Sequence, residues 1–210
     1  MSREDILKRV RTALGRIPGQ SPTEIPAARL IASKANPEAR LLQFCKAVDA
    51  LAGKAYCAVS KADACAYASS LLGTGTAIAS DALLLQECGI TALAGVKTGP
   101  PDEEDLRRLC ATADLGITGA DYALADTGTL VMLASAKEAR MISLLPPVHL
   151  AVLSRDRILA DLDELFLLLP RPDQVTSSMV FITGPSRTGD IEQILIRGVH
   201  GPGEIHVVIV

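Results

Sequence analysis

The sequence contains no tryptophan and only six other aromatic residues, three tyrosines and three phenylalanines. An extended surface for stacking nucleic-acid bases is therefore not expected. The formal net charge is −3, and no cluster of lysine and arginine marks a helix face. These shortages argue against nucleic acid as a principal partner.

Closely spaced cysteines are also missing. The five cysteines form no C-x-x-C pair and lie at Cys45, Cys57, Cys65, Cys88 and Cys110. Iron–sulfur clusters and structural zinc sites need thiolates that converge on one metal. We therefore predict no metal and no cofactor, and we expect most of these cysteines to be small residues of the core.

Long apolar runs are absent as well, and no segment approaches the roughly 20 residues of a membrane-spanning helix. The N-terminus is charged and helical rather than signal-like. We predict a cytoplasmic protein with no membrane insertion. Its 210 residues, 49% of them hydrophobic, can bury a full core in one compact domain.

An extension precedes that domain. Residues 2–14 read as a helix, with Ser2 capping it and Gly15 ending it. Proline and glycine are then frequent up to the middle thirties, a composition typical of a linker or a clasp. We therefore assign residues 1–35 to an N-terminal helix and a proline-rich extension.

Residues 36–210 read as an α/β domain that opens with a helix from Pro37 to about Leu51. Short β-rich runs then alternate with helical stretches. The predicted strands are Ala55–Val59, Ala77–Ala79, Thr91–Ala94, Asp114–Thr118, Thr129–Ala134, His149–Leu153, Met179–Thr183 and Ile205–Val210. The predicted helices span residues 61–72, 81–88, 102–112, 137–143, 156–168 and 190–197.

Many of these strands are continuously apolar, as in a sheet that is covered on both faces. The alternation predicts an α/β fold with a doubly wound, mostly parallel sheet and helices on both faces. In such sheets ligands bind beyond the carboxyl ends of the strands. The strand at Thr129–Ala134 follows its predecessor too closely for a helical crossover, so we expect one antiparallel pairing there.

The turn after the strand Met179–Thr183 is dense in glycine, proline, serine and threonine. A short amphipathic helix is expected to open at Asp190, with Gln193 as its capping-box partner. Free backbone N–H groups at such a helix start make a site for a carboxylate or phosphate. We predict that a small anionic ligand binds at Gly184, Ser186, Arg187, Thr188 and Asp190. The alternative is that these residues only turn the chain and cap the helix.

A second candidate segment contains two acidic residues, Asp121 and Asp126, and Thr-Gly-Thr follows the second of them. Near a pocket, Asp126 could act as a general base, a nucleophile or a hydroxyl acceptor. We predict a catalytic role for Asp126, with Thr127 and Gly128 binding the ligand. The alternative is ordinary turn chemistry, in which Asp bonds the next N–H groups, and for Asp121 we favour it.

One arginine and two histidines complete the candidate set. Arg140 could hold a ligand carboxylate bidentately or could neutralise a helix C-terminus. His149 starts an apolar strand, where a lone histidine is more often structural, and we include it as a ligand-binding candidate. His200 lies in a loop between a valine and Gly-Pro, where function is common, and is our second catalytic candidate. His206 is expected to be structural.

Together these segments resemble the LUD-domain family, which includes the lactate-utilisation protein C group. The resemblance covers residues 36–210. Its motifs in this sequence are Gly116-Ile-Thr, Ala125-Asp-Thr-Gly-Thr, Arg140, Leu145-Pro146, His149, Thr183-Gly-Pro-Ser-x-Thr-x-Asp190-Ile-Glu192 and Gly198-Val-His-Gly-Pro202. Relatives often have Glu where this chain has Asp126, and the shorter side chain weakens the case for an obligatory nucleophile or base.

The resemblance implies a fold similar to the sugar-phosphate isomerase and CoA-transferase superfamily. It also implies a role in oxidising L-lactate to pyruvate, beside partner subunits that carry iron–sulfur clusters. Three hypotheses stay open: a non-redox component that binds a small anion, a purely structural subunit, or a stand-alone enzyme. That enzyme would be of isomerase or CoA/acyl-transfer type, acting on a phosphorylated or CoA-linked substrate through Asp126 and His200.

Overall fold

The computed structural model describes residues 2–16, 30–31, 35–99, 102–135, 139–169, 176–189 and 196–210. Helix α1 (Arg3–Ala13) begins at Ser2, which forms a reciprocal capping box with Asp5. The predicted N-terminal helix is thus confirmed. Within residues 3–13, no side chain is buried.

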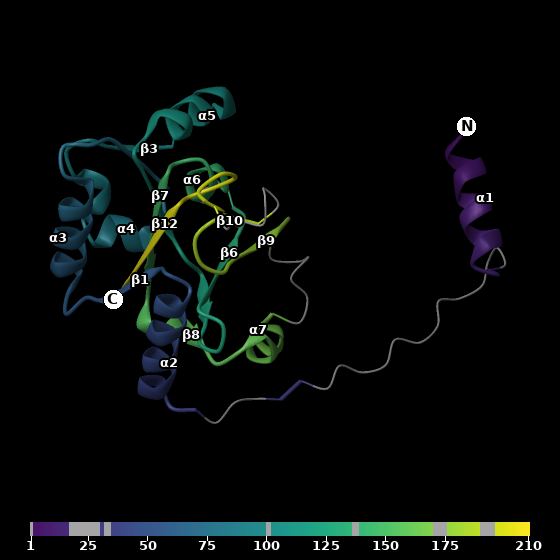
Figure 1. The fold of residues 1–210 in the computed structure, drawn as a ribbon, viewed down its shortest axis with the longest axis horizontal. Helices are drawn as coiled ribbons and strands as arrows, with labels where there is room; N and C mark the ends of the chain where they lie inside the picture. The colour runs from purple at the N-terminus through teal and green to yellow at the C-terminus, as the bar shows by residue number, and fades with distance from the viewer. Residues whose placement is uncertain are drawn as a thin grey trace.

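The main sheet contains, among the described residues, six strands in the order β1-β12-β7-β4-β2-β3 (Figure 1). In chain order these strands are β1 (Lys54–Cys57), β2 (Ala77–Ala79), β3 (Val96–Thr98), β4 (Leu115–Gly119), β7 (Val148–Leu153) and β12 (Glu204–Ile209). All of their pairings are parallel, so each connection must cross over the sheet. The predicted α/β fold with a mostly parallel sheet is confirmed.

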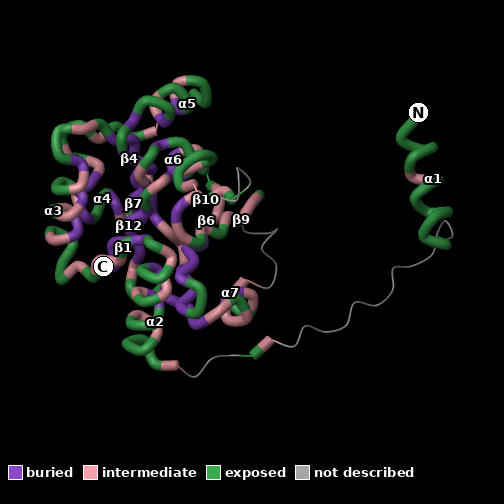
Figure 2. The backbone as a smooth tube through the Cα atoms, viewed as in Figure 1, coloured by how far each residue is buried: buried purple, intermediate pink, exposed green. Residues whose placement is uncertain are grey.

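Helices cover both faces of this sheet. Side chains of β7 and β12 alternate between two apolar clusters, because successive residues of a strand point to opposite faces. One cluster contains α3 (Lys61–Leu72) and α4 (Leu83–Glu87), and the other contains α2 (Pro37–Ala50). Helices α5 (Glu103–Thr112) and α6 (Met141–Leu144) join Ile78 in a third cluster. Figure 2 shows the resulting buried centre.

A second sheet mixes antiparallel and parallel pairings. Its order is β8-β5-β6-β9, and its strands are β5 (Tyr122–Leu124), β6 (Thr129–Leu133), β8 (Ile158–Leu159) and β9 (Met179–Ile182). The antiparallel pairing expected at Thr129–Ala134 is confirmed, since β6 pairs antiparallel with both β5 and β9. The sequence led us to expect β6 and β9 in the same sheet as the parallel strands, and this expectation was wrong. The chain leaves the main sheet after Gly119, where Asp121 N already bonds Val131 O.

Three predicted elements are wrong in type, in whole or in part. Thr91–Ala94 is not a strand: a 3-10 helix, η1 (Ile90–Ala92), occupies it and the strand starts at Val96. Glycines with positive φ on either side, Gly89 and Gly95, turn the chain at both ends of η1 and delay the strand.

The predicted helix 156–168 is correct only in its second half. The segment begins with η2 (Arg155–Arg157) and β8, and α7 (Leu162–Leu168) then starts at the capping residue Asp161. Residues 196–197 of the predicted last helix form strand β11 (Ile196–Arg197), paired with β10 (Arg187–Thr188). Residues 190–195 lie outside the described part, as do residues 137 and 138 of the predicted helix 137–143, whose last residues fall in α6.

Candidate functional site

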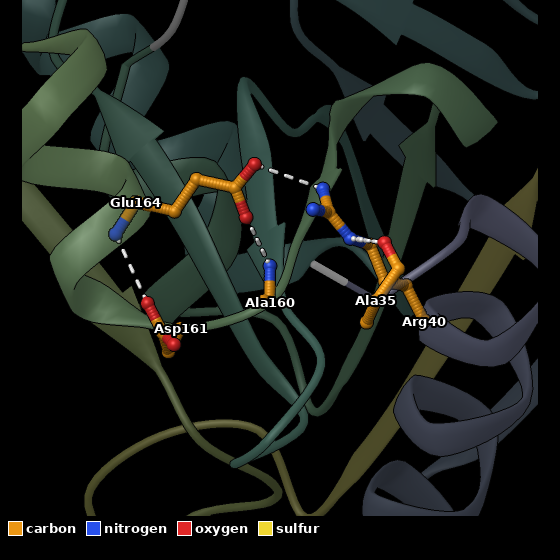
Figure 3. Close-up of polar contacts among 5 residues, drawn as sticks. All are labelled: Ala35, Arg40, Ala160, Asp161 and Glu164. Atoms are coloured by element: carbon orange, nitrogen blue, oxygen red, sulfur yellow. Dashed lines mark hydrogen bonds and ion pairs between the residues drawn. The ribbon is translucent and has the colours of Figure 1, made fainter. Parts of the chain in front are cut away.

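Helix α2 is anchored by a half-buried ion pair (Figure 3). Arg40 Nη1 lies 2.9 Å from Glu164 Oε1, and their side chains are only 16% and 20% exposed. Arg40 Nε donates to Ala35 O, and Glu164 Oε2 accepts from Ala160 N. The Arg40–Glu164 pair therefore holds the start of α2 against the β8–α7 connection, and the two backbone contacts fix the orientation of each partner.

The turn that carries Asp126 packs directly on α2. Gly128 has φ +66°, and a Cβ at this position would lie 2.8 Å from the backbone of Ala47. Only glycine permits this close approach in this conformation. Asp126 itself is exposed, and its Oδ1 accepts from Thr127 Oγ1 at 3.1 Å. The close packing of this turn against α2 is thus enough to explain the glycine of the Asp-Thr-Gly-Thr motif.

A chain of hydroxyl groups joins this turn to the end of β9. Thr129 Oγ1 lies 2.8 Å from both Thr127 Oγ1 and Thr183 Oγ1. The next residue, Gly184, has φ +78° and would place a Cβ 2.9 Å from Leu51 Cβ. Two motifs that are far apart in sequence therefore meet at the C-terminal end of α2.

Arg187 completes this contact. Its Nη2 donates to Leu51 O at 2.7 Å, and Leu51 is the C-cap residue of α2. A cation there satisfies a terminal carbonyl and opposes the negative end of the helix dipole. Arg187 as a residue is exposed, and its guanidinium makes no other hydrogen bond to the described part of the chain. Arg187 therefore has a structural role whether or not a ligand is present.

The Gly184–Ser186 turn is also bonded to the loop that carries His200. Ser186 N donates to Pro202 O at 2.8 Å, and Gly198 N donates to Ser186 O at 3.0 Å. His200 is exposed on that loop. The structure therefore brings the last two sequence motifs together through their backbones.

A pocket of about 410 Å³ opens beside this cluster, at the amino ends of β1 and β12. It is lined by Ala52, Lys54, Arg197, Gly203, Glu204 and Ile205. Lys54 Nζ lies 3.1 Å from Glu204 Oε2, and this neighbour lowers the pKa of the Glu204 carboxyl. Arg197 has no carboxylate partner in the part of the chain that the structure describes. We call this region the amino-edge pocket.

The sequence missed Lys54 and Arg197 as site residues. Each is an ordinary basic residue within its own segment, and no motif marks either. Only the register of two short strands places Arg197 directly opposite Arg187. Thr188 follows Arg187 in β10, so its side chain points to the opposite face.

Two predicted ligand-binding residues lie apart from this cluster. His149 is wholly buried in β7, where its Nε2 lies 2.8 Å from Thr118 Oγ1. Burial lowers the pKa of His149 to about 4, so the ring is neutral at physiological pH. Arg140 is exposed before α6 and borders Ala134, Ser143 and Val180. Asp190 lies outside the described residues, with the helix start on which the predicted anion site depended.

Metal-binding groups and membrane-spanning helices can be assessed only for the described residues. No group of three or more His, Cys, Asp or Glu side chains there could hold a metal ion. In the same part of the chain, no helix is both long enough and apolar enough to span a bilayer.

The fold and this geometry define a doubly wound α/β domain with a basic pocket at the amino edge of its main sheet. The chain belongs to the LUD domain family, whose model matches residues 41–210. The family resemblance drawn from the sequence motifs is thereby confirmed. The motifs therefore identify the family even where their residues serve packing.

Similar proteins carry lactate-utilisation names. A Lactate utilization protein C of Halalkalibacterium halodurans is 40% identical over 94 residues, which are 43% of this chain and 41% of that protein. One of Exiguobacterium sp. is 38% identical over 111 residues, 51% of this chain and 48% of that protein. A Lactate utilization protein B of Shouchella clausii is 34% identical over 113 residues, 51% of this chain and 22% of that protein. The match thus spans less than half of each relative.

A solved structure shares the fold. The crystal structure of a DUF162 family protein from Deinococcus radiodurans superimposes with a TM-score of 0.64. The superposition covers 83% of this chain and 98% of that one, at 19% sequence identity. At this identity the likeness establishes the fold alone.

Proposed function

We propose that this protein is a cytoplasmic, non-redox component of L-lactate utilisation, the oxidation of lactate to pyruvate. In this role it binds a small anion, a carboxylate or a phosphate, at the amino-edge pocket. Membership of the LUD domain family and the names of its relatives support the lactate role. The charges of the pocket support the ligand class.

The observation that carries the anion site is the pairing of Arg187 with Arg197. Residues directly opposite in an antiparallel pair present their side chains on one face, and like charges there repel each other. Arg187 is partly engaged by Leu51 O, whereas Arg197 has no carboxylate partner among the described residues. An anion between the two guanidinium groups would relieve their repulsion and accept charge-assisted hydrogen bonds.

Other motif residues would serve this site by shaping it. Gly128 and Gly184 allow their turns to approach α2, and Ser186 bonds the turn to the loop before β12. Lys54 would add a second source of positive charge, although Glu204 already pairs with it. We therefore assign ligand contact to Arg187, Arg197 and Lys54, and support to the glycines and Ser186.

The contacts favour binding over catalysis by this chain alone. A stand-alone enzyme of isomerase or CoA-transfer type would need Asp126 and His200 to act on one substrate. No hydrogen bond or ion pair joins these two residues, both of which lie in the described part. Asp126 accepts a hydrogen bond only from its neighbour Thr127 there.

A non-redox component needs partners that transfer electrons. We propose that iron–sulfur protein subunits fill that role. The relatives include proteins named both B and C, which supports a system with more than one subunit. Co-expression with a cluster-bearing subunit should yield a complex with the visible absorbance of the cluster. Separate elution of the two proteins would contradict this part of the proposal.

Titration calorimetry with lactate, pyruvate and inorganic phosphate tests the anion site. Arg197→Gln should weaken the binding of whichever anion the native protein takes by about tenfold or more, because a charge-assisted contact is lost. Arg155→Gln, which removes the same charge outside both pockets, is the matched control and should change affinity by less than about twofold. Equal losses in both variants, or no binding of any of the three anions, would overturn the proposal.

A further inference from the structure

The order of strands in the main sheet reverses between β2 and β4. Strand β2 leads outward to β3, whereas β4 leads the other way to β7 and then β12. In open α/β sheets, the crevice outside the carboxyl ends of two such strands is the general place for a ligand. A ligand is therefore expected beside the segments that follow β2 and β4.

A pocket of about 440 Å³ lies at this position. Ala82 and Leu83 enter it from the loop after β2, and Gly119 and Asp121 enter it from the end of β4. Its volume lies within the range of roughly 300–1,000 Å³ that organic ligands occupy. We call it the carboxyl-edge pocket. No predicted site residue lines it, since Asp121 was interpreted as turn chemistry.

Asp121 presents a carboxyl group to this pocket. Its Oδ2 accepts from Leu133 N at 2.7 Å, while Oδ1 takes no hydrogen bond from the residues that the structure describes. Burial raises the pKa of Asp121, against the smaller opposing effects of the Leu133 hydrogen bond and the Arg157 charge. A carboxyl that resists ionisation, lines a pocket and has one oxygen without a hydrogen bond to the described residues is available to a ligand.

Arg157 brings a cation to the same pocket. Its guanidinium carbon lies 5.5 Å from the centre of the Tyr122 ring, and Nη1 lies 3.4 Å from Tyr122 Oη. Arg157 and Asp121 both line the pocket and are both described, yet no ion pair joins them. The neighbouring Arg155, by contrast, pairs with Glu38. The guanidinium is therefore positioned by an aromatic face, and its one hydrogen bond to a described residue is the one to Tyr122 Oη.

The rest of the wall combines apolar and polar groups. Leu83, Leu84 and Leu133 supply apolar surface, and Ser154 borders the pocket at the end of β7. Glu87 also lines it and is paired with Lys61 at 2.6 Å, so that this acid is already compensated. Mostly apolar walls with a few convergent polar groups are typical of organic-ligand sites.

We propose that the carboxyl-edge pocket is a second ligand site that binds an amphipathic organic anion. The anionic group of the ligand pairs with Arg157, its apolar body lies against Leu83, Leu84 and Leu133, and a polar substituent meets Asp121. The volume fits a molecule larger than lactate or phosphate. This ligand is thus different from the anion proposed for the amino edge.

The charges around Asp121 predict how the affinity depends on pH. The facing charged or titratable groups are Arg157 of η2, Tyr122 of β5 and the compensated pair of Glu87 with Lys61. When Asp121 ionises, it repels an anionic ligand and competes for Arg157. The affinity for an anion should therefore rise as the pH falls, and Asp121→Asn should remove this dependence.

Anilinonaphthalene sulfonate is a suitable probe, because it joins a sulfonate to an aromatic body. Its neutral relative N-phenylnaphthylamine has a similar body without the anion. Both fluoresce in apolar surroundings, and the protein contributes no tryptophan signal. The native protein should bind the sulfonate saturably at one site and more tightly than the amine.

Arg157→Gln should weaken sulfonate binding by about tenfold or more while changing the affinity for the amine little. Arg155→Gln removes the same charge two residues away, outside the pocket, and should leave both affinities unchanged. Equal affinities in the two variants, or no saturable sulfonate binding by the native protein, would overturn the proposal. Arg197→Gln should not affect the sulfonate, so the two proposed sites can fail separately.

Discussion

The two edges of the main sheet are built differently. At the amino edge, the motif residues already contact one another, through Gly128 on α2, Arg187 on Leu51 and Ser186 on Pro202. At the carboxyl edge, Asp121 and Arg157 face an open pocket without forming an ion pair. A dense sequence motif thus marks where backbones approach closely, whereas the more open polar groups, Asp121 and Arg157, were not among the predicted site residues.

This difference has a physical cause. A glycine with positive φ, or one pressed against a neighbouring backbone, tolerates no other side chain, so such a position is strongly restricted. A pocket wall needs only suitable size and polarity and can be built from ordinary leucine, serine and arginine. The two edges should therefore respond differently to substitution, which the following predictions test in order of decreasing effect.

Gly116→Ala should cause the largest loss of stability. A Cβ at Gly116 would lie 2.0 Å from Ile142 O, and both groups are held in the core. We expect a loss of at least about 3 kcal/mol in the free energy of unfolding, measured by denaturant titration. Gly189→Ala is the control, because no described residue lies within 4 Å of its added Cβ. Similar stability of the two variants would show that β4 can move away from α6.

Arg40→Gln should be the next most damaging change. It leaves Glu164 without its partner in a site that is about four-fifths buried, and it should cost about 2–3 kcal/mol. It should also weaken anion binding at the amino edge, because α2 forms part of that edge, and spare the sulfonate probe. Arg155→Gln breaks only the exposed pair with Glu38 and should cost less than about 0.5 kcal/mol. Equal costs would contradict the anchoring role of Arg40.

His149, near the amino end of β7, should make the free energy of unfolding depend on pH. Burial lowers its pKa from 6.5 to about 4, so the unfolded chain takes up a proton that the folded protein refuses. The His149 contribution is fully present above pH 6.5 and is lost as the pH falls toward about 4, by roughly 3 kcal/mol at most. His149→Gln should flatten this slope in urea titrations at several pH values. A slope that persists in this variant would contradict the prediction.

Asp121→Asn should have the smallest effect and the opposite sign. The raised pKa of Asp121 means that the fold disfavours its ionised form, so the wild-type stability declines as the pH rises through that pKa. Asparagine is neutral and its oxygen can still accept from Leu133 N. At neutral pH the variant should be more stable by less than about 1 kcal/mol, as measured by thermal unfolding. A clear loss of stability would assign Asp121 to structure and weaken the case for the carboxyl-edge pocket.

The elements that the sequence predicted well have strong local signals. Helix α2 begins at Asn36-Pro37 and α1 at its capping box, and both signals act within four residues. The apolar runs of β7 and β12 predicted buried parallel strands because burial on both faces leaves no alternation. The type of fold followed from these elements.

The errors fall where tertiary contacts override local pattern. Strand β8 has only two residues, and its pairing with β5 is not visible in the sequence. The sequence pattern of its segment therefore favoured a helix. The second sheet was missed because its strands differ from those of the main sheet only in their partners. His149 had the residue type of a ligand, and only its burial beside Thr118 shows a neutral core side chain.

By itself, the sequence determined the alternation of helices and strands, the family and the glycine-rich turns, since each depends on residues that are close along the chain. The tertiary structure alone decided that Arg187 faces Arg197, that α2 supports two distant motifs, and that Asp121 and Arg157 share a pocket. These pairs are created by strand register and by the reversal of strand order between β2 and β4. Both are settled by the burial of the whole core, which no single segment encodes.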